Sequence, residues 1–130
     1  MPVIVAVDHD RHQVSVVAVG PVTLQDAFNQ FEHEVRGGGL SYPKFIDVRG
    51  AGVLITPEEN RLIAEKMLEF NRRTPMGPVA FVVSSNTAAE AIGVLVKLIG
   101  DAVAIRVFRE ESEARAWLDS YGRRRQAAGC

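Results

Sequence analysis

The sequence predicts a mixed, mostly parallel five-stranded sheet with four helices, in the order β-β-α-β-α-β-α-β-α. Short runs rich in β-branched residues alternate with longer segments that carry an apolar stripe at helical spacing. Such alternation requires crossover connections, which make neighbouring strands parallel. With 130 residues, 47% of them hydrophobic, the chain can fill one core. We expect one domain over residues 1–122 and a flexible basic tail over residues 123–130.

The chain opens with two β-branched runs, at residues 3–7 and 14–19, separated by a polar segment. This arrangement is typical of an antiparallel hairpin. Gly20 and Pro21 are expected to end the second strand, since both residues favour turns. The hairpin therefore supplies an antiparallel edge to the sheet.

The first helix begins after Thr23, which is an N-cap with Asp26 three residues later. Three glycines at residues 37–39 end it. Its apolar residues recur at helical spacing and predict a single buried stripe: Leu24, Ala27, Phe28, Phe31 and Val35.

Two further strands and a second helix occupy the middle of the chain. Residues 44–48 form a short strand, and Thr56 begins a helix that ends near residues 72–75. Pro57 at the first helical position and Glu59 three residues after Thr56 complete a capping box. The next run, at residues 78–83, is continuously apolar, as parallel strands buried on both faces usually are.

The third helix, capped by Asn86 or Thr87, carries more apolar surface than one stripe. Only Glu90, Gly93 and Lys97 form a narrow polar line along it. Three explanations are open: a homodimer or another protein packs on this helix, a lipid or other apolar ligand lies beneath it, or neighbouring helices bury it. The candidate dimer or ligand face consists of Ile92, Leu95 and Ile99.

The last strand, at residues 102–108, and the last helix lie in the stretch AIRVFREESEARAWLDSY. Ala114, Trp117, Leu118 and Tyr121 form one stripe of that helix. A strand that ends in Phe, an acidic helix start and Ala-x-x-Trp-Leu resemble the STAS domain, specifically the SpoIIAA-like proteins related to bacterial anti-sigma-factor antagonists. The resemblance covers roughly residues 1–121. It implies a non-enzymatic regulatory module for protein–protein interaction, of the partner-switch type.

Thr56 has two interpretations. In phosphorylated members of the family, a strand aspartate or asparagine is followed nine positions later by a serine, typically inside Asp-Ser-Ser-Gly. Counting from Asp47 places Thr56 at that position, although Ile55 and the Pro57–Glu58 pair depart from the pattern. Thr56 is therefore either a plain helix cap or a phospho-acceptor.

Polar residues follow the strands at the carboxyl edge of the sheet, where ligand sites of parallel sheets gather. Such a rim could bind a phosphate or the acidic loop of a partner. The alternative is that these residues are turn formers, helix caps and solvated arginines. The candidate rim consists of Asp47, Arg49, Ser84, Ser85, Asn86 and Arg109.

Composition excludes several classes of function. The net charge is -1, with 15 basic and 16 acidic residues, so no overall field attracts nucleic acid or anionic lipid. Glu90 and Lys97 interrupt the longest apolar helix before it could span a bilayer, and Cys130 is the single cysteine, so we expect a cytoplasmic protein without disulfides. His9 and His12 lie in a short hairpin connection, which favours a solvated turn over a metal site.

No catalytic pair is indicated by spacing, and neither a cofactor nor an enzymatic activity is expected. The sequence predicts a cytoplasmic homodimer that engages a regulatory protein partner. The alternative is a small carrier of lipid or another apolar ligand, with a cavity beside the helix at residues 87–99.

Overall fold

The computed structural model describes residues 3–129, with side chains described for residues 3–121. Its sheet has five strands in the order β1-β2-β3-β4-β5. β1 runs antiparallel to β2, and every later neighbouring pair is parallel. The predicted fold class is confirmed, and the strands are β1 (Val3–Asp8), β2 (Gln13–Val22), β3 (Lys44–Val53), β4 (Val79–Val82) and β5 (Ile105–Phe108).

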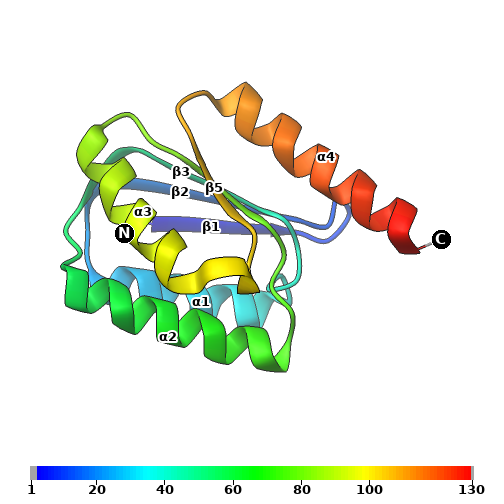
Figure 1. Ribbon diagram of the computed structural model, residues 1–130, viewed down its shortest axis with the longest axis horizontal. Coiled ribbons are helices and arrows are strands. Elements are labelled where there is room, and N and C mark those ends of the chain that lie inside the picture. The colour runs from blue at the N-terminus through cyan, green and yellow to red at the C-terminus, as the bar shows by residue number, and fades with distance from the viewer. Residues whose placement is uncertain (1–2, 130) are drawn as a thin grey trace.

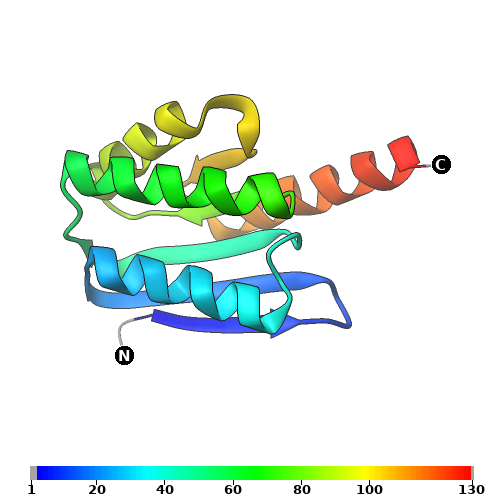
Figure 2. The ribbon, with the colours of Figure 1, turned by 90° about the horizontal axis from the view of Figure 1, so that it is seen from below.

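The helices lie on both faces of the sheet. α1, α2 and α3 lie side by side over one face (Figure 2), and α4 lies on the opposite side (Figure 1). A short 3-10 turn at Gly100–Ala102 follows α3. The helices in the described residues are α1 (Leu24–Gly37), α2 (Pro57–Arg73), α3 (Asn86–Ile99) and α4 (Glu111–Gly129).

Two hydrophobic cores result from this layering. The larger one lies under α1, α2 and α3, where Val16 and Ile46 of the sheet meet Phe31, Ile63 and Ile92 of the helices. The smaller one lies under α4 and consists of Phe45, Ala80, Val82, Ala114 and Leu118, with Phe108 and Trp117 packed beside it. As the sequence predicts, the alanine at position 114 is fully buried.

α4 packs against β3, β4 and β5, which leaves part of its face of the sheet uncovered. On that face, Ile4 of β1 lies opposite Val17 of β2, and Val17 lies opposite Asp47 of β3. Ile4, Val17 and Val19 are exposed to 64%, 41% and 59%. We call this surface the open face.

β2 and β3 are longer than the sequence predicts. The expected ends at residues 19 and 48 are wrong, because the two segments beyond them pair with each other, with Gly20 opposite Ala51 and Val22 opposite Val53. Gly20 has φ +76°, a conformation that favours glycine, and the pairing shifts register between Val17 and Val19. Local turn propensity cannot reveal a pairing between distant segments.

Other boundaries differ by one to a few residues. Ser85 is the N-cap of α3, because its Oγ accepts a hydrogen bond from the Ala88 amide at 3.1 Å, so the expectation of Asn86 or Thr87 is wrong. β5 begins at Ile105 because the 3-10 turn occupies the start of the expected strand. α4 continues into the segment at residues 123–130 for which the sequence predicts a flexible basic tail. The flexibility of that tail stays a prediction, since side chains after residue 121 and all of residue 130 lie outside the described part.

Within residues 3–129, none of the helices combines the length and the apolar character that crossing a bilayer requires.

Candidate functional site

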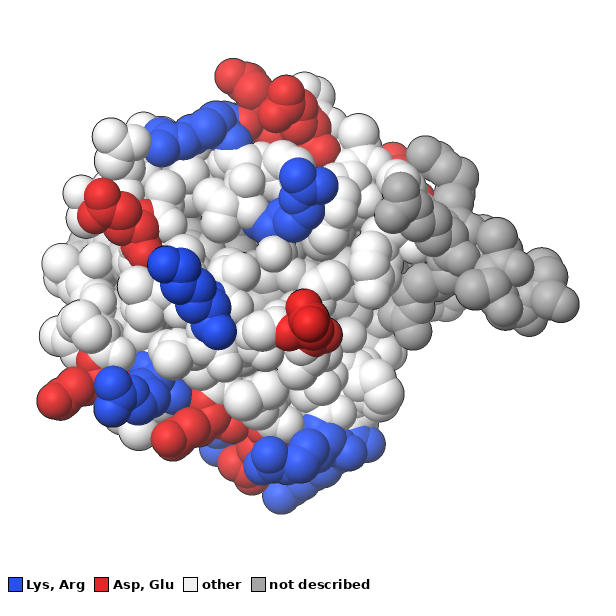
Figure 3. Space-filling model, in the orientation of Figure 1, with Lys and Arg blue, Asp and Glu red and all other residues white. Residues whose placement is uncertain are grey.

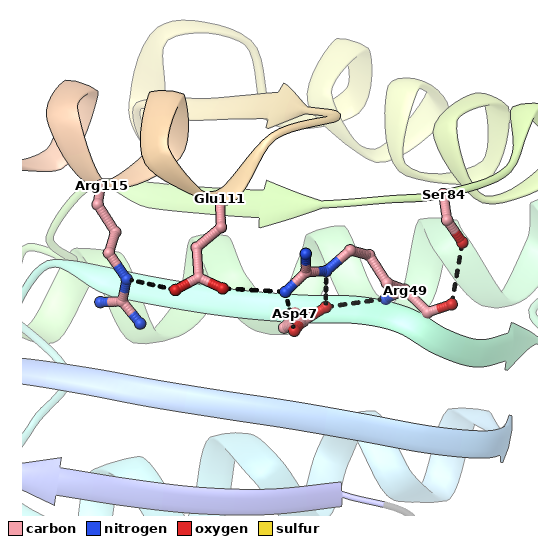
Figure 4. A network of polar contacts seen from close by, with 5 residues as sticks. All are labelled: Asp47, Arg49, Ser84, Glu111 and Arg115. Atoms are coloured by element: carbon pink, nitrogen blue, oxygen red, sulfur yellow. Dashed lines mark hydrogen bonds and ion pairs between the residues drawn. The ribbon is translucent and has the colours of Figure 1, made fainter.

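A network of charged and polar side chains joins β3 to α4 beside the open face (Figure 4). Arg49 lies at its centre and donates two hydrogen bonds to Asp47, from Nε at 3.0 Å and from Nη2 at 2.8 Å. The same Nη2 lies 3.0 Å from Glu111 Oε1, and Arg115 Nε donates to Glu111 Oε2 at 3.0 Å. Ser84 donates its hydroxyl to the Arg49 carbonyl at 2.9 Å. We call these five residues the charged network.

The members of the charged network stabilise one another's ionised forms. The hydrogen bond from Arg49 lowers the pKa of Asp47 against the opposing effect of burial. Hydrogen bonds from Arg115 and Arg49 lower the pKa of Glu111, and Asp47 raises the pKa of Arg49. Arg49 and Glu111 are exposed to 40% and 44%, so these ion pairs add little to the stability of the fold. The network is better suited to fixing side-chain positions at a surface.

Replacing Asp47 with asparagine should remove part of the acid sensitivity of the fold. Because the pKa of Asp47 is lowered in the folded chain, its charge stabilises the fold above its unfolded pKa, and this contribution is lost as the pH falls through the folded pKa. We therefore expect the urea midpoint of Asp47→Asn to lie below that of the wild type at pH 7 and to equal it at pH 2. The difference between the two midpoints should disappear below about pH 4. Asp119→Asn, at an exposed position of α4, is the matched control. A difference in urea midpoint between Asp47→Asn and the wild type that stays constant with pH would contradict the stabilising role of the Asp47 charge.

The remaining rim residues are placed at the same edge of the sheet but outside the network. Arg109 donates from Nη2 to Asn86 Oδ1 at 2.7 Å, and Ser85 serves as the cap of α3. Sequence reasoning missed Glu111 and Arg115. Their spacing of four residues at an acidic helix start was the available signal, since residues at this spacing face each other.

Thr56 is exposed and forms the expected capping box at the start of α2. Its hydroxyl oxygen accepts from the Glu59 amide at 3.1 Å, and Glu59 Oε1 accepts from the Thr56 amide at 3.0 Å. The sequence-derived role as helix cap is therefore present in the structure. Phosphorylation of this hydroxyl stays a prediction.

A buried ion pair that sequence reasoning missed joins α1 to the start of β3. Lys44 Nζ lies 3.4 Å from Glu34 Oε1, and the two side chains are 1% and 0% exposed. Lys44 also donates to the carbonyls of Leu40, at 2.6 Å, and Tyr42, at 3.3 Å, while Gln30 donates to Glu34 Oε2 at 3.0 Å. Burial raises the pKa of Glu34 and lowers the pKa of Lys44, and each partner opposes the shift of the other.

The stripe predicted for α1 is wrong at its last position. Val35 is 44% exposed, whereas Glu34 is fully buried. Both residues fit the helical spacing from Phe31, and hydrophobicity alone favours the valine. The lysine on the neighbouring strand decides the outcome, because a buried carboxylate needs a partner.

The candidate dimer or ligand face on α3 lies inside the molecule. Ile92, Leu95 and Ile99 are 6%, 6% and 4% exposed and belong to the larger core. The sheet and helices of this chain bury these three residues. The large apolar residues that α3 presents to solvent are Val94 and Leu98, which are 40% and 41% exposed. Figure 3, in the same view of the molecule as Figure 1, shows a mostly uncharged surface with scattered residues of both signs.

The two hairpin histidines contact an aromatic residue. His9 Nδ1 and the Tyr42 hydroxyl are 2.7 Å apart, and the ring centroid of His12 lies 5.2 Å from that of Tyr42. Among the side chains that the structure describes, no group of three or more His, Cys, Asp or Glu residues is placed to hold a metal ion.

Comparisons with known proteins support the fold. No family model matches the sequence, and no curated protein matches it. Among solved structures, the chain is similar to an uncharacterized protein from the DUF3478 family with a SpoIIAA-like fold from Shewanella loihica PV-4, with a TM-score of 0.57 and 17% sequence identity. The match covers 89% of this chain and 93% of that chain. At this identity the likeness concerns architecture alone. Together with the order and pairing of its strands, it shows that the chain has a SpoIIAA-like α/β fold.

Proposed function

We propose that this protein is a non-enzymatic module for protein–protein interaction in the cytoplasm, which forms a homodimer through β1 and the open face beside it. The observation that carries the proposal is that an apolar edge strand adjoins an apolar face that no helix of the described chain covers. Such surfaces are the usual places where protein chains associate.

β1 lacks the features that protect edge strands from pairing with another chain. Its six residues, VIVAVD, contain no lysine, arginine or proline, and their register with β2 is unbroken. β1 lies at the end of the strand order, so the backbone groups on its outer side have no strand partner in this sheet. A second copy can supply that partner about a two-fold axis, because an antiparallel pair of identical strands is self-complementary.

Antiparallel pairing of β1 with its copy joins the two open faces side by side into one continuous surface. Ile4, Val17 and Val19 provide an apolar centre, and Asp47, opposite Val17, begins a polar border. An apolar centre with a polar border is typical of protein interfaces.

The regulatory part of the proposal depends on the resemblance to SpoIIAA-like proteins. A partner of the anti-sigma-antagonist type would meet the carboxyl edge of the sheet, which β1 pairing leaves free. Thr56, Ser84, Asn86 and Arg109 are exposed there and offer hydroxyl, amide and guanidinium groups. The balance of 15 basic against 16 acidic residues favours a protein partner over a nucleic acid.

Replacing Ile4 with lysine should convert the dimer to a monomer. The position is 64% exposed in the single chain, so the fold should tolerate lysine, whereas a lysine on an edge strand opposes pairing with another chain. Light scattering after size exclusion should give a doubled mass for the wild type and a single mass for Ile4→Lys, with association weakened at least about tenfold, or 1.4 kcal/mol. Circular dichroism should show both proteins folded.

Leu98→Lys is the matched control, because it places the same charge on α3 at a position that is 41% exposed. It should leave the doubled mass unchanged. If Leu98→Lys gives monomers and Ile4→Lys does not, association occurs through α3 and our assignment of the interface is wrong. A wild type that stays monomeric at millimolar concentration would remove the homodimer altogether.

A further inference from the structure

A partly open cavity of about 100 Å³ lies between the sheet and the helices α1, α2 and α3, against the larger core. Its wall is almost entirely apolar. The residues that form it include Val16, Ile46 and Val79 from the sheet and Ile63, Ile92 and Leu95 from the helices. It lies on the face of the sheet opposite α4 and the open face, and Val3 is the residue of β1 that lines it.

The polar residues that border the cavity are already engaged with other groups of the chain. Asn60 Nδ2 donates to the Ala91 carbonyl at 3.1 Å, and Gln30 Nε2 donates to Glu34 at 3.0 Å. The Lys44 ammonium lies between the Glu34 carboxylate and two backbone carbonyls. A bound molecule would therefore find dispersion contacts and few free hydrogen-bonding groups.

We propose that this cavity is a binding site for a small uncharged apolar molecule, a single ring or a short alkyl chain. An apolar cavity of about 150 Å³ stays free of water and accepts benzene, so a cavity of about 100 Å³ is close to the size at which such ligands fit. An ionised ligand is disfavoured. Moving a charge out of water into an apolar cavity is costly, and Lys44, the charged residue that lines the cavity, is already paired with Glu34.

Two features of the wall favour occupation. Met67 and Met76 both contribute to it, and the flexible thioether side chain adapts its shape to different ligands. Val53 and Ile55, at the end of β3 and in the connection to α2, line the cavity and are only partly buried. The cavity therefore reaches partly exposed residues at this connection.

A titration with benzene, followed by methyl NMR, tests the site. The methyl signals of Ile92 and Leu95 should shift saturably, and those of Val17 and Val19 on the open face should stay in place. Sodium benzoate, which has the same ring with a charge, should cause no saturable shift. The absence of a saturable shift with benzene, or equal binding of benzoate, would overturn the proposal.

Filling the cavity should abolish binding without unfolding the protein. Ala91 lines the cavity, and Ala91→Leu adds three carbons to it, so the affinity for benzene should fall at least about tenfold. Ala116→Leu makes the same change at an exposed position of α4 and should bind as the wild type does. Should Ala91→Leu fail to fold, Ala27→Val fills the cavity less from α1 and should still weaken binding. Benzene shifts that persist unchanged in a folded, filled variant would show that the ligand binds elsewhere.

Discussion

Replacing Lys44 with methionine should destabilise the fold by about 3–5 kcal/mol, because it leaves the Glu34 carboxylate buried without its ionic partner. Glu34 is fully buried, Oε1 makes no hydrogen bond within the described structure, and the neutral Gln30 amide is the donor that remains for Oε2. The free energy of unfolding, measured in urea at pH 7, gives the effect directly.

The double variant Glu34→Leu with Lys44→Met is the informative control for this experiment. Apolar side chains of similar size remove both charges together, and such replacements of a buried pair are often neutral or stabilising. The double variant should therefore recover most of the stability that Lys44→Met loses. If the double variant is as unstable as Lys44→Met, the lysine stabilises the fold through its bonds to the Leu40 and Tyr42 carbonyls rather than through the ion pair.

Replacing Gly77 with alanine should cost about 3 kcal/mol, the upper end of the usual cost of overpacking a core. Gly77 is buried ahead of β4, and an added Cβ would lie 2.6 Å from the Ser41 carbonyl oxygen and close to the Tyr42 carbonyl. Both neighbours are backbone atoms, so no change of rotamer can relieve the contact. Thermal and urea unfolding should both report the loss.

Gly93→Ala separates this steric effect from the general cost of losing a glycine. Gly93 lies inside α3, and an added Cβ there meets nothing within 4 Å. Alanine favours the helical backbone more than glycine does, so this variant should gain about 0.5–1 kcal/mol. Equal behaviour of the two variants would mean that the close contact at residue 77 relaxes without cost.

The features of the fold that could be predicted are those that short segments of sequence determine by themselves. Periodicity distinguished strands from helices, and the capping boxes at Thr23 and Thr56 lie where side-chain spacing placed them. The extensions of β2 and β3 were not predictable, because their glycines read locally as turns and pair only when the distant segments meet. The burial of Glu34 in place of Val35 has a similar cause, since Lys44, ten residues later in the chain, pairs with the buried carboxylate.

The candidate site also contains residues that the sequence indicated and residues that it could not indicate. Strand ends indicated Asp47, Arg49 and Ser84, because carboxyl ends of parallel strands share one edge. Glu111 and Arg115 join them only because α4 crosses to the opposite face of the sheet, which helix periodicity does not reveal. The open face depends on the same crossing, since it is the part of that face which α4 leaves uncovered.

Hydrogen exchange of the β1 amides, measured across a range of protein concentrations, tests the proposed association through this strand most directly. The outward amides of an edge strand exchange rapidly until a second strand pairs with them. We expect protection of Val3–Asp8 to rise as the protein passes from monomer to dimer, while the exposed side of α3 stays unchanged. Exchange in β1 that is independent of concentration, or protection that appears on α3 instead, would contradict the proposed role of β1.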